Sequence, residues 1–271
     1  MMNESPNTKI ALVTGAARGL GRAMALGLAK AGYRVAACDL TDSDKELRTL
    51  ADEARAFGRG ELRPFHVDIS DFESCRAAVH DVLQQFGPVD ILVNNAGIGM
   101  EQVTSRIHDN PFKFYEIDET FWLRVININL IGTFRMTKLI APLQIQRGWG
   151  RIINVTTGLA TMVRAGFSPY GPSKAGVEAA TTIWSKELAN TGVTANVLIP
   201  GGPADTRMIP VEDLSDRAAL VPPAAMVAPL LYLVSPAANH TTGKRFIAKL
   251  WQSELPPEKA AVLAGAPAAW N

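Results

Sequence analysis

Residues 9–21 read KIALVTGAARGLG, and this stretch decides the fold. Its beginning, KIALVT, is a short apolar run of the kind that forms a buried strand, and glycines follow at positions 15, 19 and 21. The next residues, 21–32, have the apolar spacing of a helix. A strand that turns through glycines into a helix presents free backbone N–H groups and the positive helix end. Such a turn suits an anionic pyrophosphate group.

The alternation of that first unit continues along the chain. Further apolar strand segments are predicted at 34–39, 61–67, 91–95, 151–156, 194–199 and 245–251. Helices are predicted between them at 42–57 and 71–86, from Asp118 to near Gln146, and at about 172–190. Helical connections of this length join parallel strands, which are then covered on both faces.

The sequence therefore predicts an α/β fold of the doubly wound Rossmann type, with a parallel sheet and helices on both of its faces. We expect one domain over 1–271, with a core at about 9–250 and a C-terminal tail at 251–271. The tail departs from the strand and helix pattern. It is expected either to cap a neighbouring subunit or to be disordered.

The charge balance limits the partners that the chain attracts. Its 27 basic and 26 acidic residues leave a net charge of +1, which gives no overall attraction to nucleic acid or to an anionic membrane. No stretch has the roughly eighteen unbroken apolar residues of a membrane span. The two cysteines have no C-x-x-C partner, and the histidines have no metal-ligand spacing. We expect a cytoplasmic protein that acts on a small molecule and holds no metal.

Asp39 stands at the end of the second predicted strand, about twenty residues beyond the glycine turn. A carboxylate there accepts hydrogen bonds from both hydroxyls of an adenosine ribose and repels a 2′-phosphate. Asp39 therefore favours NAD over NADP. Arg18, immediately before Gly19, offers a partner for a 2′-phosphate and leaves NADP as the alternative.

A tyrosine and a lysine are spaced for proton transfer at 170–174, in the sequence YGPSK. Lys174 lies one helical turn beyond Tyr170, and Pro172 between them fits only the first turn of a helix. A phenol has a pKa of about 10 and is a poor base at neutral pH. We expect the ammonium of Lys174 to lower the pKa of Tyr170, which then acts as a general acid or base.

Three motifs together resemble the short-chain dehydrogenase/reductase family. They are T-G-x-x-x-G-x-G at 14–21, N-N-A-G at 94–97 and Y-x-x-x-K at 170–174, and the resemblance runs from about Lys9 to about Ile247. It implies a nicotinamide-dependent oxidoreductase that transfers a hydride to or from an alcohol or ketone carbon. It also implies a homo-oligomer, most simply a tetramer, for which apolar residues on the two long helices are candidates: Leu130, Ile131, Val177 and Ile183.

The resemblance implies a catalytic asparagine, serine, tyrosine and lysine. Asn129, in NINLIGTF, falls at the asparagine position, and Tyr170 and Lys174 match directly. The position thirteen residues before Tyr170 holds Thr157, where the family usually has serine. A threonine supplies the same hydroxyl with an added methyl group. Thr156 is the alternative hydroxyl.

The resemblance also implies a set of cofactor contacts. Tyr170 and Lys174 belong to it, and Asp68 is expected near the adenine, with Pro200 and Thr206 near the nicotinamide. Thr206 stands one residue farther from Pro200 than the family pattern, so its contact is the weakest of the set. The remaining expected contacts are Gly15, Arg18, Gly19, Leu20, Gly21, Asp39, Asn95 and Gly97.

The motifs favour one function and leave two others open. The leading hypothesis is an NAD-dependent alcohol dehydrogenase or ketone reductase, whose substrate specificity comes from 98–119, 158–168 and 200–225. An NADPH-dependent 3-oxoacyl reductase is the second, and it needs a phosphate-binding site for which three arginines are available: Arg164, Arg207 and Arg217. The third is a dinucleotide-sensing protein without catalytic activity. The paired Tyr170 and Lys174 argue against it.

Overall fold

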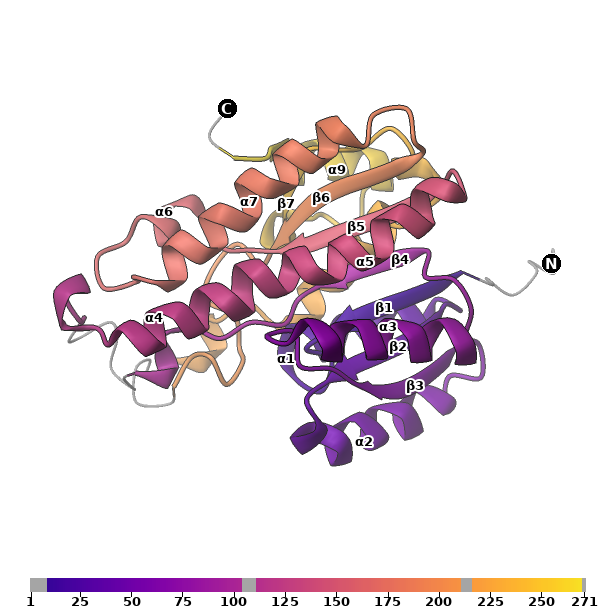
Figure 1. The fold of residues 1–271 in the computed structure, drawn as a ribbon. Helices are drawn as coiled ribbons and strands as arrows, with labels where there is room; N and C mark the ends of the chain where they lie inside the picture. The colour runs from indigo at the N-terminus through magenta and orange to yellow at the C-terminus, as the bar shows by residue number, and fades with distance from the viewer. Residues whose placement is uncertain (1–8, 104–110, 211–215, 270–271) are drawn as a thin grey trace.

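The computed structural model describes residues 9–103, 111–210 and 216–269 (Figure 1). In these residues one sheet of eight strands has the order β3-β2-β1-β4-β5-β6-β7-β8. The strands are β1 (Ile10–Thr14), β2 (Arg34–Asp39), β3 (Glu61–His66), β4 (Ile91–Asn94), β5 (Gly150–Val155), β6 (Val193–Ile199), β7 (Lys244–Ile247) and β8 (Gly265–Pro267). The first seven are parallel, and β8 pairs antiparallel with β7.

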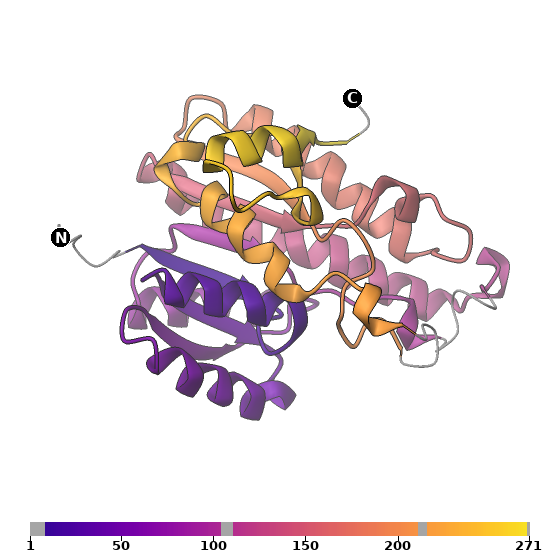
Figure 2. The same ribbon diagram turned by 180° about the vertical axis from the view of Figure 1, so that it is seen from behind.

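Helices cover both faces of the sheet, as the sequence predicts. Figure 1 looks onto α3 (Phe72–Gln85), α5 (Thr133–Gln146) and α7 (Tyr170–Glu187). The opposite face, seen in Figure 2, carries α1 (Gly19–Lys30), α2 (Asp44–Arg55), α8 (Val227–Leu233) and α9 (Pro257–Ala264). Two more helices, α4 (Glu119–Ile126) and the short α6 (Leu159–Met162), extend from the sheet beyond the ends of its strands (Figure 1). The predicted α/β Rossmann architecture is confirmed.

The central strands are largely apolar because both of their faces are buried. Successive side chains of β1 alternate between two cores: Val13 packs with Met24 of α1, while Leu12 packs with Val79 of α3 and Ile140 of α5. Every residue of β1, β4, β5 and β6 is buried. The ends of these strands are therefore fixed positions on which a site can be built.

The strand order reverses at β1, which places the ligand crevice. β1 pairs with β2 on one side and with β4 on the other, so the connections leave the sheet in opposite directions. A doubly wound sheet opens a crevice at the carboxyl ends of its strands where this reversal occurs. The glycine turn after Thr14 and the N-N-A-G sequence in and after β4 meet there.

The C-terminal tail is not disordered over 251–269. It forms α9 and then β8, which pairs with Phe246 and its neighbours in β7 of the same chain. The predicted strand at 245–251 also ends early, at Ile247. A three-residue strand, GAP, has too little alternation to be recognised in a sequence, and its position comes from the edge of β7.

Two observations concern other kinds of site. Among the described residues, no helix combines the length and the apolar character needed to cross a bilayer. In the same part of the chain, no three His, Cys, Asp or Glu side chains are grouped so that they could hold a metal ion.

Candidate active site

The turn between β1 and α1 is possible only because its glycines have no side chains. Gly15 has a φ of +65°, and a Cβ there would lie 2.8 Å from the Cα of Ala96. A Cβ on Gly21 would lie 2.1 Å from the carbonyl oxygen of Gly15. Both positions are closed to any other residue. The result is a backbone cradle at the N-terminus of α1 that fits the diphosphate of a dinucleotide.

Side chains from the ends of β1 and β4 hold this cradle. The hydroxyl of Thr14 accepts hydrogen bonds from the backbone N–H groups of Asn95 and Ala96, both at 3.1 Å. The amide of Asn95 donates to the carbonyl oxygens of Thr14 and Gly15, at 2.9 and 3.1 Å. Asn95 thus supports the glycine turn from β4 in addition to lining the cleft.

Two charged side chains face the ribose end of the crevice. The carboxylate of Asp39 accepts the backbone N–H groups of Ala17 and Leu40, each at 2.9 Å, which fixes it at the end of β2. The guanidinium of Arg18 donates to the hydroxyl of Ser43 at 3.0 Å. Because this partner is neutral, the charge of Arg18 is not balanced by a carboxylate of the described residues. The negatively charged Asp39 and the positively charged Arg18 both line the cleft.

A single cleft of about 790 Å³ joins these residues to the tyrosine and lysine. Of the expected cofactor and catalytic residues, all line it except Gly21 and Asn129, which lie behind its wall. Asp68 is held in that wall, since its carboxylate accepts the N–H of Ser70 at 2.8 Å. The volume lies in the range typical of ligand sites.

Tyr170 is the first residue of α7, and Lys174 follows one turn later. Pro172 lies in the first turn, as expected from its missing N–H. The ammonium of Lys174 donates to the carbonyl oxygen of Val155 at 3.0 Å and lies 5.9 Å from the centre of the Tyr170 ring. Burial lowers the pKa of Lys174 to about 8.

The sequence predicts that Lys174 lowers the pKa of Tyr170, and this prediction is wrong for the cleft as it stands in the structure. Burial, helped by the negative charge of Glu101, raises the pKa of Tyr170 to about 12, and a hydrogen bond with Thr157 only partly opposes this. The ammonium of Lys174 is directed at the backbone of β5 instead of the phenol oxygen. At neutral pH the phenol is therefore protonated and can donate a proton.

The two threonines at the end of β5 have different partners. Thr157 hydrogen-bonds Tyr170 and lines the cleft. Thr156 is buried, and its hydroxyl donates to the carboxylate of Glu178 at 3.0 Å. The structure thus places Thr157 beside the phenol, at the position that the spacing indicates, and gives Thr156 a place in the core.

Asn129 lies in a π-helical turn, Asn127–Gly132, between α4 and α5. Its side chain is fully buried, accepts the N–H of Ile98 and donates to the carbonyl oxygen of Ile98, both at 2.9 Å. It also donates to the hydroxyl of Ser173 at 3.0 Å. A Cβ on Gly97 would lie 2.9 Å from its Oδ1 and 3.3 Å from the Nζ of Lys174. Asn129 therefore ties the segment after β4 to the start of α7.

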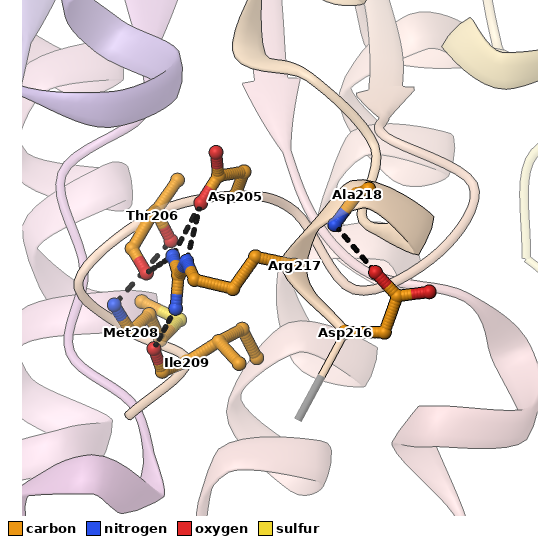
Figure 3. A network of polar contacts seen from close by, with 7 residues as sticks. All are labelled: Asp205, Thr206, Met208, Ile209, Asp216, Arg217 and Ala218. Atoms are coloured by element: carbon orange, nitrogen blue, oxygen red, sulfur yellow. Dashed lines mark hydrogen bonds and ion pairs between the residues drawn. The ribbon is translucent and has the colours of Figure 1, made fainter. Parts of the chain in front are cut away.

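The segment after β6 closes the cleft and is held by Arg217 (Figure 3). The guanidinium donates to the carboxylate of Asp205 at 3.0 Å and to the carbonyl oxygens of Ile209 and Thr206 at 3.1 and 3.3 Å. Arg217 is thus engaged within its own loop and does not line the cleft, whereas Arg164 and Arg207 do. The methyl group of Thr206 would be 3.0 Å from a Cβ on Gly19, so this threonine lies over the glycine turn.

Sequence reasoning did not single out several residues of the cleft, among them Glu101, Met208 and Phe167. Glu101 and Met208 lie in segments without periodic pattern, and Phe167 packs its ring edge-on against Tyr170 at 6.4 Å between centres. The only sequence signal for these residues was the mixture of polar and apolar side chains in 98–119, 158–168 and 200–225. Such a mixture indicates which segments are candidates for substrate contact, but it does not identify the side chains that make the contact.

A profile of the short chain dehydrogenase family matches residues 9–214. The chain is 42% identical over 197 residues to nodulation protein G of Azospirillum brasilense, covering 71% of this chain and 74% of that protein. It is 31% identical over 244 residues to the 3-oxoacyl-acyl-carrier-protein reductase FabG of Thermotoga maritima, covering 87% and 94%. A crystal structure of a variant actinorhodin polyketide ketoreductase with NADPH matches with a TM-score of 0.74 at 31% identity, covering 88% and 94%. The chain therefore belongs to the short-chain dehydrogenase/reductase family and is an oxidoreductase that transfers a hydride between a nicotinamide cofactor and an alcohol or ketone carbon.

Proposed function

We propose that this oxidoreductase works as a ketone reductase in which Tyr170 donates a proton to the substrate oxygen. The observation that carries the proposal is the protonated phenol of Tyr170 in the cleft, with a pKa of about 12, hydrogen-bonded to Thr157. The reduced nicotinamide supplies the hydride to the carbonyl carbon when it is bound. The proton from the phenol then completes the hydroxyl group, so the carbonyl gains one hydride at carbon and one proton at oxygen, and Tyr170 is left as the phenolate.

The chain's own residues divide the remaining work. Thr157 hydrogen-bonds the phenol and is placed to donate a second hydrogen bond to the substrate oxygen. Lys174 holds a positive charge near the phenolate that proton donation leaves. Asn129 lies behind the cleft wall and, through its hydrogen bonds to Ile98 and Ser173, supports the first turn of α7, from which Tyr170 and Lys174 extend. This division favours catalysis over a dinucleotide-sensing role, which needs none of these hydroxyl contacts.

A screen of ketones and acyl thioesters, followed by the loss of reduced-nicotinamide absorbance, tests the proposal. We expect ketone reduction to be the faster direction at pH 7. The 3-oxoacyl reductase hypothesis remains the second candidate because several relatives carry that name and because Arg164 and Arg207 line the cleft. Faster turnover of a 3-oxoacyl thioester than of any simple ketone would favour it.

We propose NAD(H) as the coenzyme, because the carboxylate of Asp39 is fixed at the cleft wall by two backbone hydrogen bonds. A 2′-phosphate at this end of the site would meet that negative charge. Arg18, with its unbalanced charge, weighs toward NADP, as does the NADPH of the related ketoreductase structure. The preference for NAD or NADP is set by which side chain, Asp39 or Arg18, lies nearer the 2′ position of the ribose.

NADH should bind at least about tenfold more tightly than NADPH, a difference of about 1.4 kcal/mol. Asp39→Asn keeps an oxygen that accepts the N–H of Ala17 and removes the negative charge. It should therefore reduce the difference in affinity between NADH and NADPH. Arg18→Gln is the matched control and should leave NADH binding nearly unchanged. Calorimetric titration of the wild type and both variants with each coenzyme measures all six affinities. Tighter binding of NADPH to the wild type, abolished by Arg18→Gln, would reverse the assignment.

Thr157→Val should lower kcat/KM about 10²-fold, since it keeps the shape and deletes a hydroxyl that binds the reacting oxygen. Thr157→Ser should keep most of the activity and admit bulkier ketones, because only a methyl group is lost. Steady-state kinetics at saturating coenzyme measure both effects. A Thr157→Val enzyme with wild-type kcat/KM would remove this residue from the mechanism.

We also propose a homotetramer in the cytoplasm, built from single-domain subunits. On the long helices, Ile131, Phe134 and Ile183 are 37%, 44% and 54% exposed and are candidates for the contact. Two of the expected contact residues fit less well. Val177 is only 2% exposed and belongs to the interior, and Leu130 packs toward Gly176 of its own chain.

A further inference from the structure

Glu101 is a carboxylate in the cleft wall for which the catalytic set has no use. It lies in a single helical turn, Met100–Gln102, shortly after β4. The side chain lines the same cleft as Tyr170 and Thr157, and its charge contributes to raising the pKa of Tyr170. Glu101 therefore lies close to the place where the substrate oxygen is expected.

The carboxylate of Glu101 has few hydrogen-bond donors. Its Oε1 accepts two long hydrogen bonds, from the N–H of Gly99 and the side chain of Gln102, both at 3.3 Å. Its Oε2 is shielded from water and has no hydrogen-bond partner among the described residues. A carboxylate oxygen in this condition is unfavourable unless a donor arrives from elsewhere. The arrangement is typical of a group that a ligand completes.

Two of the cationic side chains that line the cleft have other contacts. Lys174 donates to the backbone of β5, and the guanidinium of Arg164 lies 5.1 Å from the centre of the Phe167 ring. No ion pair joins Glu101 to any residue in the described part of the chain. Its negative charge is thus available to a molecule in the cleft.

The space around Oε2 is shared with a movable side chain. A Cβ on Gly99 would lie 2.5 Å from Oε2 and 3.0 Å from the Cγ of Met208, so the carboxylate and the thioether meet over this glycine. Met208 belongs to the loop that Arg217 holds (Figure 3). An unbranched methionine changes rotamer at little cost. A donor group on a substrate can therefore reach Oε2 by displacing the end of Met208.

We propose that Glu101 is a specificity-determining residue that accepts a hydrogen bond from a hydroxyl or ammonium group on the carbon next to the reacting carbon. The substrates are then α-hydroxy or α-amino ketones, and the products are vicinal diols or amino alcohols. This inference rests on the proposed function, because it takes Tyr170 as the group that acts on the substrate oxygen.

Matched ketones that differ in one group test this assignment. The first set is 3-hydroxybutan-2-one, 3-aminobutan-2-one and butan-2-one, and the second is the corresponding 2-hydroxy, 2-amino and unsubstituted 1-phenylpropan-1-ones. The wild type should show at least about a tenfold higher kcat/KM for a donor-bearing ketone than for the unsubstituted member of its set. Glu101→Leu should bring this ratio close to one, and the ratio is the readout because any effect of the lost charge on the proton donor Tyr170 acts on both ketones of a set alike.

Glu101→Gln distinguishes the two donors, because an amide still accepts a hydrogen bond but carries no charge. A preference for the hydroxy ketone should survive it, whereas a preference for the amino ketone should be lost. Coenzyme affinity, measured for each variant, shows that the fold is intact, and Glu101→Ala, which also removes the acceptor, takes the place of Glu101→Leu if that variant does not fold. Equal kcat/KM across a set, or a preference that Glu101→Leu leaves intact, overturns the role of Glu101. A wild type that reduces none of the six ketones contradicts the proposed function itself.

Discussion

Tyr170→Phe is expected to lower kcat by about 10²–10⁴-fold, the usual contribution of a general acid. The change removes one oxygen atom from a side chain that is otherwise packed against Phe167, so the ring stays in place. The affinity for the coenzyme should remain within about twofold of the wild type, because the glycine turn and Asp39 are untouched. Stopped-flow measurement of a single turnover, with coenzyme affinity measured separately, checks both expectations.

Lys174→Ala is the informative companion to that variant. Its ammonium is bonded to the backbone of β5 and lies near both the phenol ring and Gly97, so its loss should weaken coenzyme binding as well as turnover. The two variants therefore separate proton donation from positioning. A Tyr170→Phe enzyme that keeps more than about a tenth of the wild-type kcat would mean that another group supplies the proton.

The second large effect is expected at Glu178, which is fully buried between α7 and β7. Its carboxylate is paired with Arg245 and also accepts the hydroxyl of Thr156 at 3.0 Å and the N–H of Ala269 at 2.9 Å. Glu178→Ala leaves a buried guanidinium without a partner, and the loss should be about 3–5 kcal/mol of unfolding free energy. Thermal unfolding should move down by about 10 °C or more.

Two controls identify the cause of that loss. Glu53→Ala removes the carboxylate of an exposed pair with Arg22 and should move the midpoint by no more than about 2 °C. Glu178→Leu combined with Arg245→Met removes both buried charges at similar volume and should recover much of the stability. A midpoint for Glu178→Ala that matches the Glu53→Ala control would show that the buried pair contributes little.

The sequence predicted those parts of the fold and of the site that are determined by residues close to one another in the chain. The glycine turn and the spacing of Tyr170 and Lys174 follow from backbone and helix geometry, which neighbouring residues encode. The raised pKa of Tyr170 could not be predicted from the sequence, because it depends on burial and on Glu101, which is distant in the chain. Nor could the sequence show that Val177 lies in the interior, since the buried residues of α7 are mostly polar while its apolar Ile183 is exposed.

The tail was the part of the fold that pattern reasoning could not place. The strand β8 has three residues and no alternation, so only the free edge of β7 determines where it lies. The buried carboxylate of Glu178 adds a second anchor through the N–H of Ala269. Both anchors are tertiary contacts between residues 19 or more positions apart, and such contacts override local preference.

The position of β8 has a consequence for how copies of this chain can associate. The sheet ends in β3 on one side and β8 on the other, and each of these outer strands contains a proline, Pro64 and Pro267. Proline has no N–H to offer an incoming strand, and β8 is short, so neither border is a good template for adding strands from another molecule. The chain is thereby guarded against the open-ended growth that leads to fibres, and ordered assembly is left to the apolar surfaces of its helices.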